Sequence, residues 1–462
     1  MRVVVCGAGE VGYHVADHLA RLGHDVTVID RSPRLVRRIS DLLEVRAIEG
    51  HASDPAVLEQ AQAADADLLI AVTALDEVNL VACQVAHTLF DITEVVARVR
   101  NPSYLAPRWQ RLFGGPPGFA LSTDRIISPE AEVAGAIFSS LEVPGASLSL
   151  RFAGGRVRAL GLSLGEECPV VETPLRQLTE LFPDLAVRVM AVEREGRLQA
   201  VTSDDQLLVG DTIYIVVQDD QVERALAAFG IEARPARDLI IVGGGEVGVG
   251  LARLMERHHR DMHVKIIEKD EDRAAFAADQ VARSVVLNGD ALQIDILKEA
   301  GIENADTLVA VTNLDQANIL ASLLARHLGE DIRTLALISR EAFAPLVHEV
   351  GIDVRIDPRA ITISSILRHI RRGGIRKVRT IADGKGEILE VRLLEHARVV
   401  HKRIREAGLP TGVVIGAIVR GDEIIIARPE TPLEAGDTLV IFAERDALRA
   451  LENLLMVDAV FY

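Results

Sequence analysis

Short apolar runs alternate with amphipathic stretches along the first part of the chain. Val, Ile and Leu dominate five such runs, at residues 2–7, 25–30, 44–50, 67–72 and 94–99. Between the first two runs, residues 11–23 place apolar side chains at helical spacing. Strands that alternate with helices predict a parallel, doubly wound sheet, so we expect an α/β fold.

The same pattern returns in the second half of the chain. The glycine turn VCGAGEVG at residues 5–12 has a counterpart, IVGGGEVG, at residues 241–248. Farther on, DADLLIAVTALDEVNLVACQVA at residues 65–86 matches NADTLVAVTNLDQANILASLLA at residues 304–325. The chain is therefore an internal duplication, and each copy begins with the same strand, glycine turn and helix.

A second kind of segment follows each of these α/β patterns. Residues 147–228 and 376–455 are rich in alternating strands, and each contains a Gly-Asp-Thr turn, at residues 210–212 and 436–438. Because a Gly-Asp turn before a β-branched run is typical of a hairpin, we expect a hairpin at each turn. A short helix follows each turn region, which predicts small α+β domains.

The predicted architecture is thus four domains in tandem. Two doubly wound, Rossmann-like nucleotide-binding domains occupy residues 1–143 and 234–373, and the small α+β domains occupy residues 144–233 and 374–462. The expected linker between the copies is residues 232–238, which contain Pro235.

The glycine turns predict phosphate binding. The first glycine makes the bend tight, the second lets the backbone approach a pyrophosphate, and the third lets the helix pack on its strand. The helix N-terminus then presents free N–H groups. The candidate turn residues are Gly7, Ala8, Gly9, Glu10, Val11 and Gly12 in the first copy and Gly243, Gly244, Gly245, Glu246, Val247 and Gly248 in the second.

An acidic residue ends the second strand of each copy, Asp30 in the first and Glu268 in the second. A carboxylate there accepts hydrogen bonds from both ribose hydroxyls and repels a 2′-phosphate. Both sites are therefore expected to prefer NAD or an adenosine nucleotide to NADP.

Composition narrows the class of protein. The net charge of −17 argues against nucleic-acid binding. The three cysteines form no motif, which is typical of a reduced, cytosolic setting. No run of eighteen apolar residues predicts a membrane span. Cys83 and His87, four apart on a predicted helix, are too few to hold a metal ion, so none is expected.

The chain resembles the TrkA family of bacterial potassium-transport regulators, which are built from RCK modules (regulator of potassium conductance). The resemblance rests on VVVCGAGEVGYHVA, on the matched segments at residues 65–86 and 304–325, on VGGGEVG and on the two Gly-Asp-Thr turns. Its order, a nucleotide-binding RCK-N half and a small RCK-C half repeated once, covers essentially the whole chain.

The resemblance implies a regulatory function and not an enzyme. It implies binding of NAD(H), and of ATP or ADP, and gating of a Trk-type membrane potassium transporter from the cytoplasmic face of the membrane. It also implies assembly into a homotetramer. Carried over by motif, the further nucleotide-binding residues are His51, Thr73, Ala74 and Arg98 in the first copy and Asp290, Thr312 and Asn313 in the second.

The two copies differ at several of these positions. In the alignment of the copies Arg98 falls opposite Ile338, Arg100 falls opposite Arg340, and His51 falls opposite Asp290. The first copy thus offers more positive charge, which suits a more highly charged nucleotide.

Some residues keep a structural interpretation beside the functional one. Thr73 and Thr312 can satisfy backbone groups at their strand ends, and Arg98 can form a surface ion pair. At the level of the whole chain, the alternative function is an NAD-dependent oxidoreductase with duplicated Rossmann domains. Against it, the sequence has no nucleophile elbow, P-loop or HExxH motif.

Overall fold

The computed structural model describes residues 1–105, 125–182, 185–231, 236–329, 331–367 and 374–455. These residues form two compact units. The first consists of Met1–Glu132 and of helix α13 from Ile361 onward, and the second begins at Val133 and holds the remaining elements. In the described residues, no helix is both long and apolar enough to cross a bilayer.

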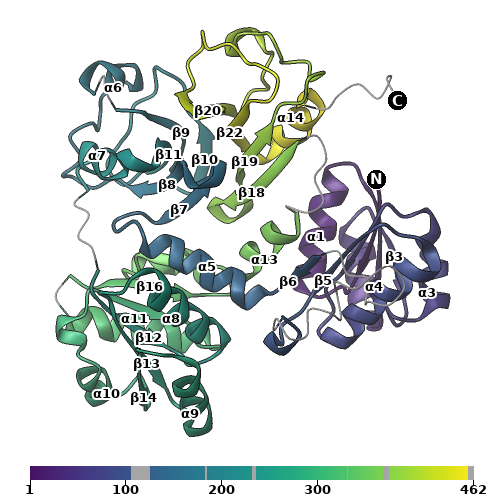
Figure 1. Cartoon of the computed structure of the whole chain (residues 1–462), viewed down its shortest axis with the longest axis horizontal. Coiled ribbons are helices and arrows are strands. Elements are labelled where there is room, and N and C mark those ends of the chain that lie inside the picture. Colours follow the sequence, from purple (N-terminus) through teal and green to yellow (C-terminus); the bar gives the residue numbers. More distant parts are fainter. Residues whose placement is uncertain (106–124, 183–184, 232–235, 330, 368–373, 456–462) are drawn as a thin grey trace. The chain divides into compact units, whose positions relative to one another are not determined.

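A six-stranded parallel sheet forms the first unit, in the order β3-β2-β1-β4-β5-β6 (Figure 1). The strands are β1 (Arg2–Cys6), β2 (Asp25–Asp30), β3 (Arg46–Glu49), β4 (Leu68–Ala71), β5 (Glu94–Arg98) and β6 (Arg125–Ile127). The helices between them are α1 (Glu10–Arg21), α2 (Pro33–Leu42), α3 (Pro55–Gln60) and α4 (Asp76–Phe90). The doubly wound α/β prediction is confirmed.

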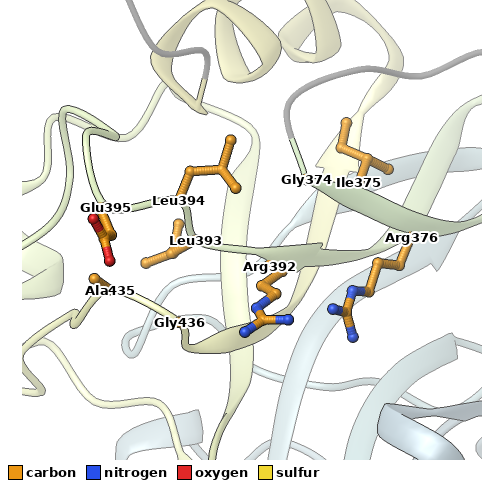
Figure 2. Close-up of a pocket in the computed structure, with 9 residues that line it drawn as sticks. All are labelled: Gly374, Ile375, Arg376, Arg392, Leu393, Leu394, Glu395, Ala435 and Gly436. Carbon is orange, nitrogen blue, oxygen red and sulfur yellow. The ribbon is translucent and has the colours of Figure 1, made fainter.

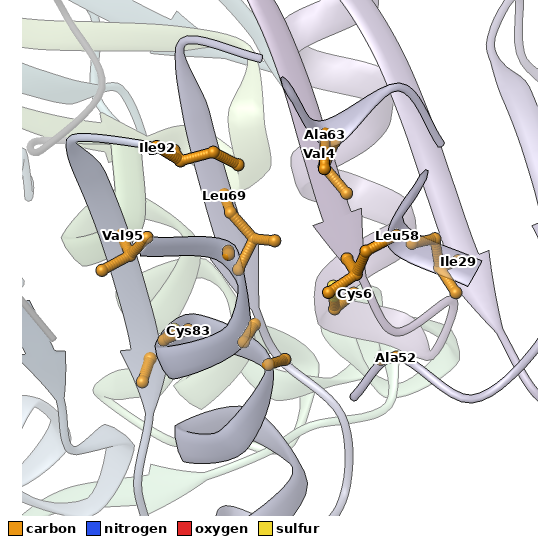
Figure 3. Close-up of a cluster of buried hydrophobic side chains, with 14 of the residues drawn as sticks. Val4, Cys6, Ile29, Ala52, Leu58, Ala63, Leu69, Cys83, Ile92 and Val95 are labelled. Atoms are coloured by element: carbon orange, nitrogen blue, oxygen red, sulfur yellow. The ribbon is translucent and has the colours of Figure 1, made fainter. Parts of the chain in front are cut away.

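Apolar side chains cover both faces of this sheet. Figure 3 shows the cluster on one face, where Val4 and Cys6 from β1 meet Leu69 from β4 and Cys83 from α4. The strands read as continuous apolar runs because neither face meets water. Burial raises the pKa of the Cys6 thiol to about 12, so this cysteine is a core residue.

The second unit contains the matching sheet, in the order β14-β13-β12-β15-β16-β17. Its strands are β12 (Asp238–Val242), β13 (His263–Glu268), β14 (Val285–Asn288), β15 (Thr307–Ala310), β16 (Arg333–Leu337) and β17 (Val354–Ile356). Its helices are α8 (Glu246–His258), α9 (Glu271–Gln280), α10 (Ile294–Glu299), α11 (Asp315–Leu328) and α12 (Ala344–Glu349). In both sheets the strand order reverses beside the first strand, which is where doubly wound folds bind ligands.

Two helices leave the sheet of their own copy. Helix α5 (Pro129–Leu141) belongs to the second unit from Val133 onward, where Phe138 packs on His258 of α8 with ring centroids 5.2 Å apart. Helix α13 (Pro358–Leu367) places Ile366 and Leu367 in the core of the first unit. The compact units therefore divide within helices. The boundaries proposed near residues 144 and 374 stay a prediction, and residues 232–235 of the expected linker lie outside the described residues.

Each small domain is a five-stranded antiparallel sheet with short helices. The first has the order β10-β9-β11-β8-β7 and the second the order β18-β19-β22-β20-β21. The first contains β7 (Leu148–Phe152), β8 (Val157–Ser163), β9 (Val187–Arg194), β10 (Arg197–Ala200), β11 (Thr212–Gln218), α6 (Leu175–Leu181) and α7 (Val222–Ala228). The second contains β18 (Ile375–Ile381), β19 (Gly386–Arg392), β20 (Val413–Arg420), β21 (Glu423–Ile426), β22 (Thr438–Glu444) and α14 (Leu448–Leu455).

The hairpin expected at each Gly-Asp-Thr turn is wrong. Strand β11 follows the turn but pairs with β8 and β9, and not with β10, which precedes it. The turn is held instead by Asp211, which is 1% exposed and accepts hydrogen bonds from Arg194 Nε and Nη2, both at 2.7 Å. Arg420 and Asp437 repeat this contact in the second small domain.

The two small domains share one core. Met190 and Val216 of the first pack with Ile388 and Phe442 of the second in a single buried cluster. Gly416 makes the close approach possible, because a Cβ atom there would lie 2.6 Å from Met190 Sδ. The central strands are apolar at successive positions since both of their faces are covered.

We expect Asp211→Asn to destabilise the first small domain by about 2 kcal/mol, because an amide forms weaker hydrogen bonds with the partly buried Arg194 than the carboxylate does. Native-state hydrogen exchange at the β11 amides measures this loss. Asp204→Asn is the matched control, because Asp204 pairs with Arg176 at the surface, and it should change the opening free energy by less than about 0.5 kcal/mol. Equal effects of the two substitutions would contradict the structural role of Asp211.

Candidate functional site

The glycine turns have the geometry that their sequence predicts. Gly7 has a φ of +114°, which favours glycine. A Cβ atom at Gly12 would lie 1.8 Å from the Gly7 carbonyl oxygen, so only glycine lets α1 pack this closely on the turn. At Gly9 a Cβ atom would meet nothing within 4 Å. The backbone at Gly9 thus borders open space, as the close approach of a phosphate requires.

The second turn repeats this geometry with one difference. Gly243 has a φ of +113°, and a Cβ atom at Gly248 would lie 2.0 Å from the Gly243 carbonyl oxygen. A Cβ atom at Gly245, however, would lie 2.7 Å from Arg273 Nη2. The guanidinium of Arg273, from α9, therefore lies over the second turn.

The acidic residues at the ends of β2 and β13 are bonded to the turns. Asp30 Oδ2 accepts a 2.7 Å hydrogen bond from Ala8 N, and Oδ1 accepts one of 2.8 Å from Ser32 N. Glu268 Oε2 accepts 2.7 Å from Gly244 N in the same way. Each carboxylate oxygen can accept more than one hydrogen bond, so both carboxylates retain capacity for ribose hydroxyls.

The helices that follow the turns begin without a side-chain cap, at Gly9 for α1 and at Gly245 for α8. By contrast, α3 is capped by Asp54 and α9 by Asp270. An uncapped N-terminus leaves backbone N–H groups for an anion, and the helix dipole favours negative charge there. Both sites therefore fit the pyrophosphate of a dinucleotide.

A buried asparagine organises the next strand end in each copy. Asn79 Oδ1 accepts hydrogen bonds from Thr73 N (2.8 Å) and Thr73 Oγ1 (2.7 Å), and its Nδ2 donates to the carbonyls of Thr73 (3.2 Å) and Arg98 (2.9 Å). Asn318 makes the same four contacts around Thr312 and Leu337. The threonine side chains thus do bond backbone groups at the strand ends, as their structural interpretation expects: Thr73 Oγ1 donates to the Leu75 carbonyl and Thr312 Oγ1 to the Leu314 carbonyl. Neither Asn79 nor Asn318 is among the site residues predicted from sequence, although the matched segments TALDEVN and TNLDQAN contain both.

Arg98 lies beside this network and is 7% exposed. Its Nη2 donates a 2.8 Å hydrogen bond to the Thr73 carbonyl, while its Nε is buried without a hydrogen-bond partner. Burial and the nearby Arg100 lower the pKa of Arg98 to about 10. Burial also raises the pKa of Glu130, whose Oε2 is likewise unpartnered. Arg98 is therefore not the surface ion pair of the alternative interpretation. It is a buried cation whose capacity for hydrogen bonds is incompletely used.

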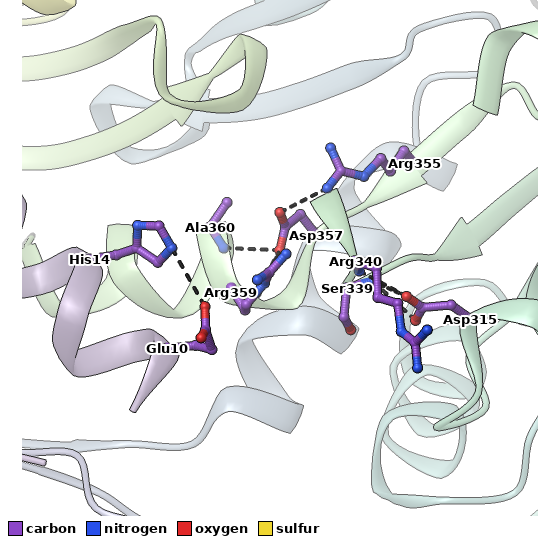
Figure 4. Close-up of polar contacts among 9 residues, drawn as sticks. All are labelled: Glu10, His14, Asp315, Ser339, Arg340, Arg355, Asp357, Arg359 and Ala360. Carbon is purple, nitrogen blue, oxygen red and sulfur yellow. Dashed lines mark hydrogen bonds and ion pairs between the residues drawn. The ribbon is translucent and has the colours of Figure 1, made fainter. Parts of the chain in front are cut away.

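The hydrogen bonds correct the alignment of the two copies by one residue. Because Asn79 bonds the carbonyl of Arg98 and Asn318 that of Leu337, Arg98 corresponds to Leu337 and not to Ile338. A second set of hydrogen bonds aligns the copies in the same way. Figure 4 shows Asp315, which accepts hydrogen bonds from the backbone N–H groups of Ser339 and Arg340.

In the first copy Asp76 accepts the corresponding bonds from Arg100 and Asn101. Arg100 therefore corresponds to Ser339, and Arg340 corresponds to Asn101. The copies remain unequal, since a buried arginine in one is a buried leucine in the other.

The remaining predicted residues lie on loops at the carboxyl edges of the sheets. His51 is exposed, with Nδ1 2.9 Å from Ser53 Oγ, and Gly50 N donates to the Asp30 carbonyl. Asp290 holds the equivalent position in copy two, where the Lys269 ammonium at 2.8 Å lowers the pKa of its carboxyl. Ala74 and Asn313 are exposed. The residue of the second copy that corresponds to His51 is therefore an aspartate that already pairs with Lys269.

Two arginines near the turns were missed by the sequence analysis. Arg38 of α2 pairs with Glu10 at 3.0 Å, and Arg273 lies over Gly245. They occupy different positions in the matched helices α2 and α9, so the comparison of the copies did not reveal them. Cys83, by contrast, is buried in the core, and His87 Nδ1 lies 3.0 Å from the Ile92 carbonyl.

Fold and site together define a class: a tandem pair of Rossmann-like modules, each with a glycine turn, a ribose-type carboxylate and an appended small antiparallel domain. Comparison with known proteins gives the family. The TrkA-N domain matches residues 3–114 and 239–358, and the TrkA-C domain matches residues 161–230 and 388–456. The chain belongs to the TrkA family.

Curated relatives match over the full length. The chain is 43% identical to the Trk system potassium uptake protein TrkA of Azorhizobium caulinodans and 36% identical to that of Halomonas elongata, with all of each chain covered in both cases. These relatives are named for potassium uptake and not for a reaction, in agreement with the expectation that the chain is not an enzyme.

Solved structures share the fold at low identity. The GsuK RCK domain superposes with a TM-score of 0.60 at 19% identity, covering 98% of this chain and 94% of that chain. A GsuK channel bound to NAD gives 0.59 at 18% identity, covering 98% and 78%. The predicted order of RCK-N and RCK-C halves, each present twice, is confirmed.

The two glycines of the first turn should respond differently to alanine. Gly12→Ala places a methyl group against the Gly7 carbonyl, so we expect thermal melting to fall by several degrees, about 2–4 °C for each kcal/mol lost. Gly9→Ala enters open space and should leave the melting temperature within about 1 °C, since it changes no packing. Differential scanning calorimetry measures both, and a larger loss for Gly9→Ala would contradict the described turn.

Proposed function

We propose that this chain is a nucleotide-binding regulatory subunit of a Trk-type potassium transporter. It binds NAD(H), and ATP or ADP, at the two glycine turns, and it gates the transporter from the cytoplasmic face of the membrane through contact with the membrane subunit. The observation that carries the proposal is the duplicated site, in which a glycine turn, an uncapped helix N-terminus and a turn-bonded carboxylate recur in both copies.

The proposed nucleotide contacts follow from the geometry. The pyrophosphate lies over Gly9 or Gly245, against the free N–H groups of the helix. Asp30 or Glu268 accepts hydrogen bonds from the ribose hydroxyls. The exposed residues Ala74 and Asn313 border the same edge of the first and the second sheet, respectively.

The two sites are proposed to prefer different nucleotides. Arg98 offers an unused N–H beside Thr73, whereas Leu337 offers none. His51 occupies the loop after β3, where the second copy has Asp290. The first site is therefore proposed to suit the more highly charged nucleotide, as inferred from sequence.

Gating requires that a nucleotide bind two packings of the modules with different affinity, because a ligand shifts an equilibrium only by its differential binding. Helix α5 begins in the first unit and continues in the second. A change at the edge of the first sheet is thereby covalently connected to the second unit. In this proposal α5 carries the response.

We also propose that the chain forms a homo-oligomer, a tetramer in the simplest ring. Two equivalent pairs of apolar side chains are exposed in the two copies, Leu75 with Leu314 and Val81 with Leu320. Val81 and Leu320 are 44% and 48% exposed, at matching positions of α4 and α11. Duplicated apolar exposure of this kind supports a protein–protein contact surface.

Calorimetric titration with NADH and ADP tests the nucleotide sites. Asp30→Ala should weaken binding at the first site about tenfold or more, because it removes two charge-assisted hydrogen bonds, and should leave the second site intact. Glu268→Ala should do the reverse. Asp25→Ala, on the same strand but at its other end and paired with Arg2, is the matched control.

Three outcomes would contradict parts of this proposal. Unchanged isotherms in both acidic variants would remove the nucleotide sites. Steady consumption of NADH with an added acceptor would favour the oxidoreductase alternative. Potassium uptake by a reconstituted Trk-type transporter that does not respond to the added chain would remove the regulatory function.

Assembly is tested by Val81→Asp combined with Leu320→Asp. Charges at both positions should shift the protein from an oligomer to smaller species in mass photometry, because they make burial of either surface unfavourable. Leu42→Asp is the control. Leu42 is 61% exposed, but the corresponding residue of the second copy is the polar Gln280, so its exposure is not duplicated. A wild-type protein that is monomeric at all concentrations would contradict the oligomer.

A further inference from the structure

The second small domain contains a pocket of about 640 Å³ at the end of strand β19. Figure 2 shows its lining, with Arg376 of β18 and Arg392 of β19 extending their guanidinium groups to the same side of the strands. Glu395, Leu393 and Leu394 line it as well. This volume lies in the range of small-molecule sites.

The two arginines are exposed and unused. Among the residues that the structure describes, neither side chain forms a hydrogen bond or an ion pair. Arg420 in the same domain, by contrast, is bonded to Asp437 and Glu434. Two neighbouring cations thus line one pocket without forming an ion pair, in a chain of net charge −17.

A β-bulge positions one of them. Ile375 pairs with Val391 and Lys377 with Glu390, so Arg376 is the extra residue that has no opposite partner. In the first small domain the pairing of β7 with β8 begins at Leu148, so Ser147, which matches Arg376, lies just before the ladder, and its N–H donates to the Gly161 carbonyl. Bulges redirect side chains and are frequent beside functional sites.

The first small domain provides an internal comparison. Its backbone frame is the same, because Gly210 N bonds the Leu164 carbonyl as Gly436 N bonds that of Leu393. Left-handed glycines also recur at matching positions, Gly145 and Gly374.

The lining side chains differ between the two frames, in charge and also in size, since Gly165 stands at the position of Leu394. The residues at the positions of Arg376 and Arg392 are Ser147 and Ser163, whereas Glu166 matches Glu395. The fold of the domain thus does not need the arginines, which are specific to the second copy.

We propose that this arginine pocket, defined by Arg376, Arg392 and Glu395, binds a small phosphorylated metabolite and is a second input separate from the nucleotide sites. Guanidinium groups match phosphate geometry with parallel N–H donors, which favours a phosphoryl group between Arg376 and Arg392. The Glu395 carboxylate accepts a hydrogen bond from a hydroxyl or amine of the ligand, and Leu393 and Leu394 contact the apolar part of the ligand. The site rests on these residues alone and does not depend on the glycine turns.

Inorganic phosphate is the probe for this site, with chloride at equal ionic strength as the salt control. Hydrogen exchange on the full chain should slow at residues 374–395 when phosphate is added. In calorimetry, Arg376→Ser with Arg392→Ser should weaken phosphate binding by at least about tenfold, since charge-assisted hydrogen bonds are lost. The double variant should fold, because the first small domain carries serine at both positions, and circular dichroism verifies this.

Arg428→Ser is the matched control, an exposed arginine of the same domain outside the pocket, and it should bind phosphate like the wild type. Citrate should compete more weakly than phosphate, and equal competition would show a site for carboxylates instead. Equal phosphate affinity of the wild type and the double variant would overturn the proposal. So would protection confined to residues 7–12 and 243–248, which would leave the nucleotide sites as the only anion sites.

Discussion

Each proposed site depends on one buried side chain, an asparagine near the start of α4 in the first copy and of α11 in the second. Asn79 and Asn318 are both fully buried, and each uses its amide to join the ends of two neighbouring strands. A buried amide is tolerated only when its donors and acceptors are paired, and here all four contacts are made. The asparagine therefore fixes where Thr73 or Thr312 lies and where the next strand turns outward. The glycine turn and the carboxylate stand beside this edge.

Sequence periodicity and the duplication predicted the parallel sheets, the glycine turns and the carboxylates, because these features are local or repeat at a fixed order. The exchange of α5 and α13 was not predicted, since the contact of Phe138 with His258 joins residues distant in sequence. The shared core of the small domains was also missed. Its signal was present in β11 and β22, whose successive apolar residues leave no polar face. The Gly-Asp turns were read wrongly for a related reason: the ion pair of a buried aspartate with the partly buried Arg194 or Arg420 holds each turn, and strand pairing does not.

The duplication keeps the backbone and varies the charges. Hydrogen bonds around the two asparagines correspond one to one, while Arg98 is replaced by Leu337 and His51 by Asp290. The small domains behave in the same way, with serines in the first where the second carries Arg376 and Arg392. Two copies of one frame can thus hold different anions, because the frame supplies backbone donors and the variable side chains supply charge. In the proposed function, a tandem chain gains several inputs in this way without a new fold.

The central claim is that both glycine turns bind nucleotide and do so unequally. Equilibrium dialysis of the full chain against NADH and against ADP measures it most directly, as the number of nucleotides bound per chain at saturation. The account predicts two nucleotides per chain, with affinities that differ between the sites and with an order that changes between NADH and ADP. Saturation at one nucleotide per chain or fewer with both ligands would contradict it.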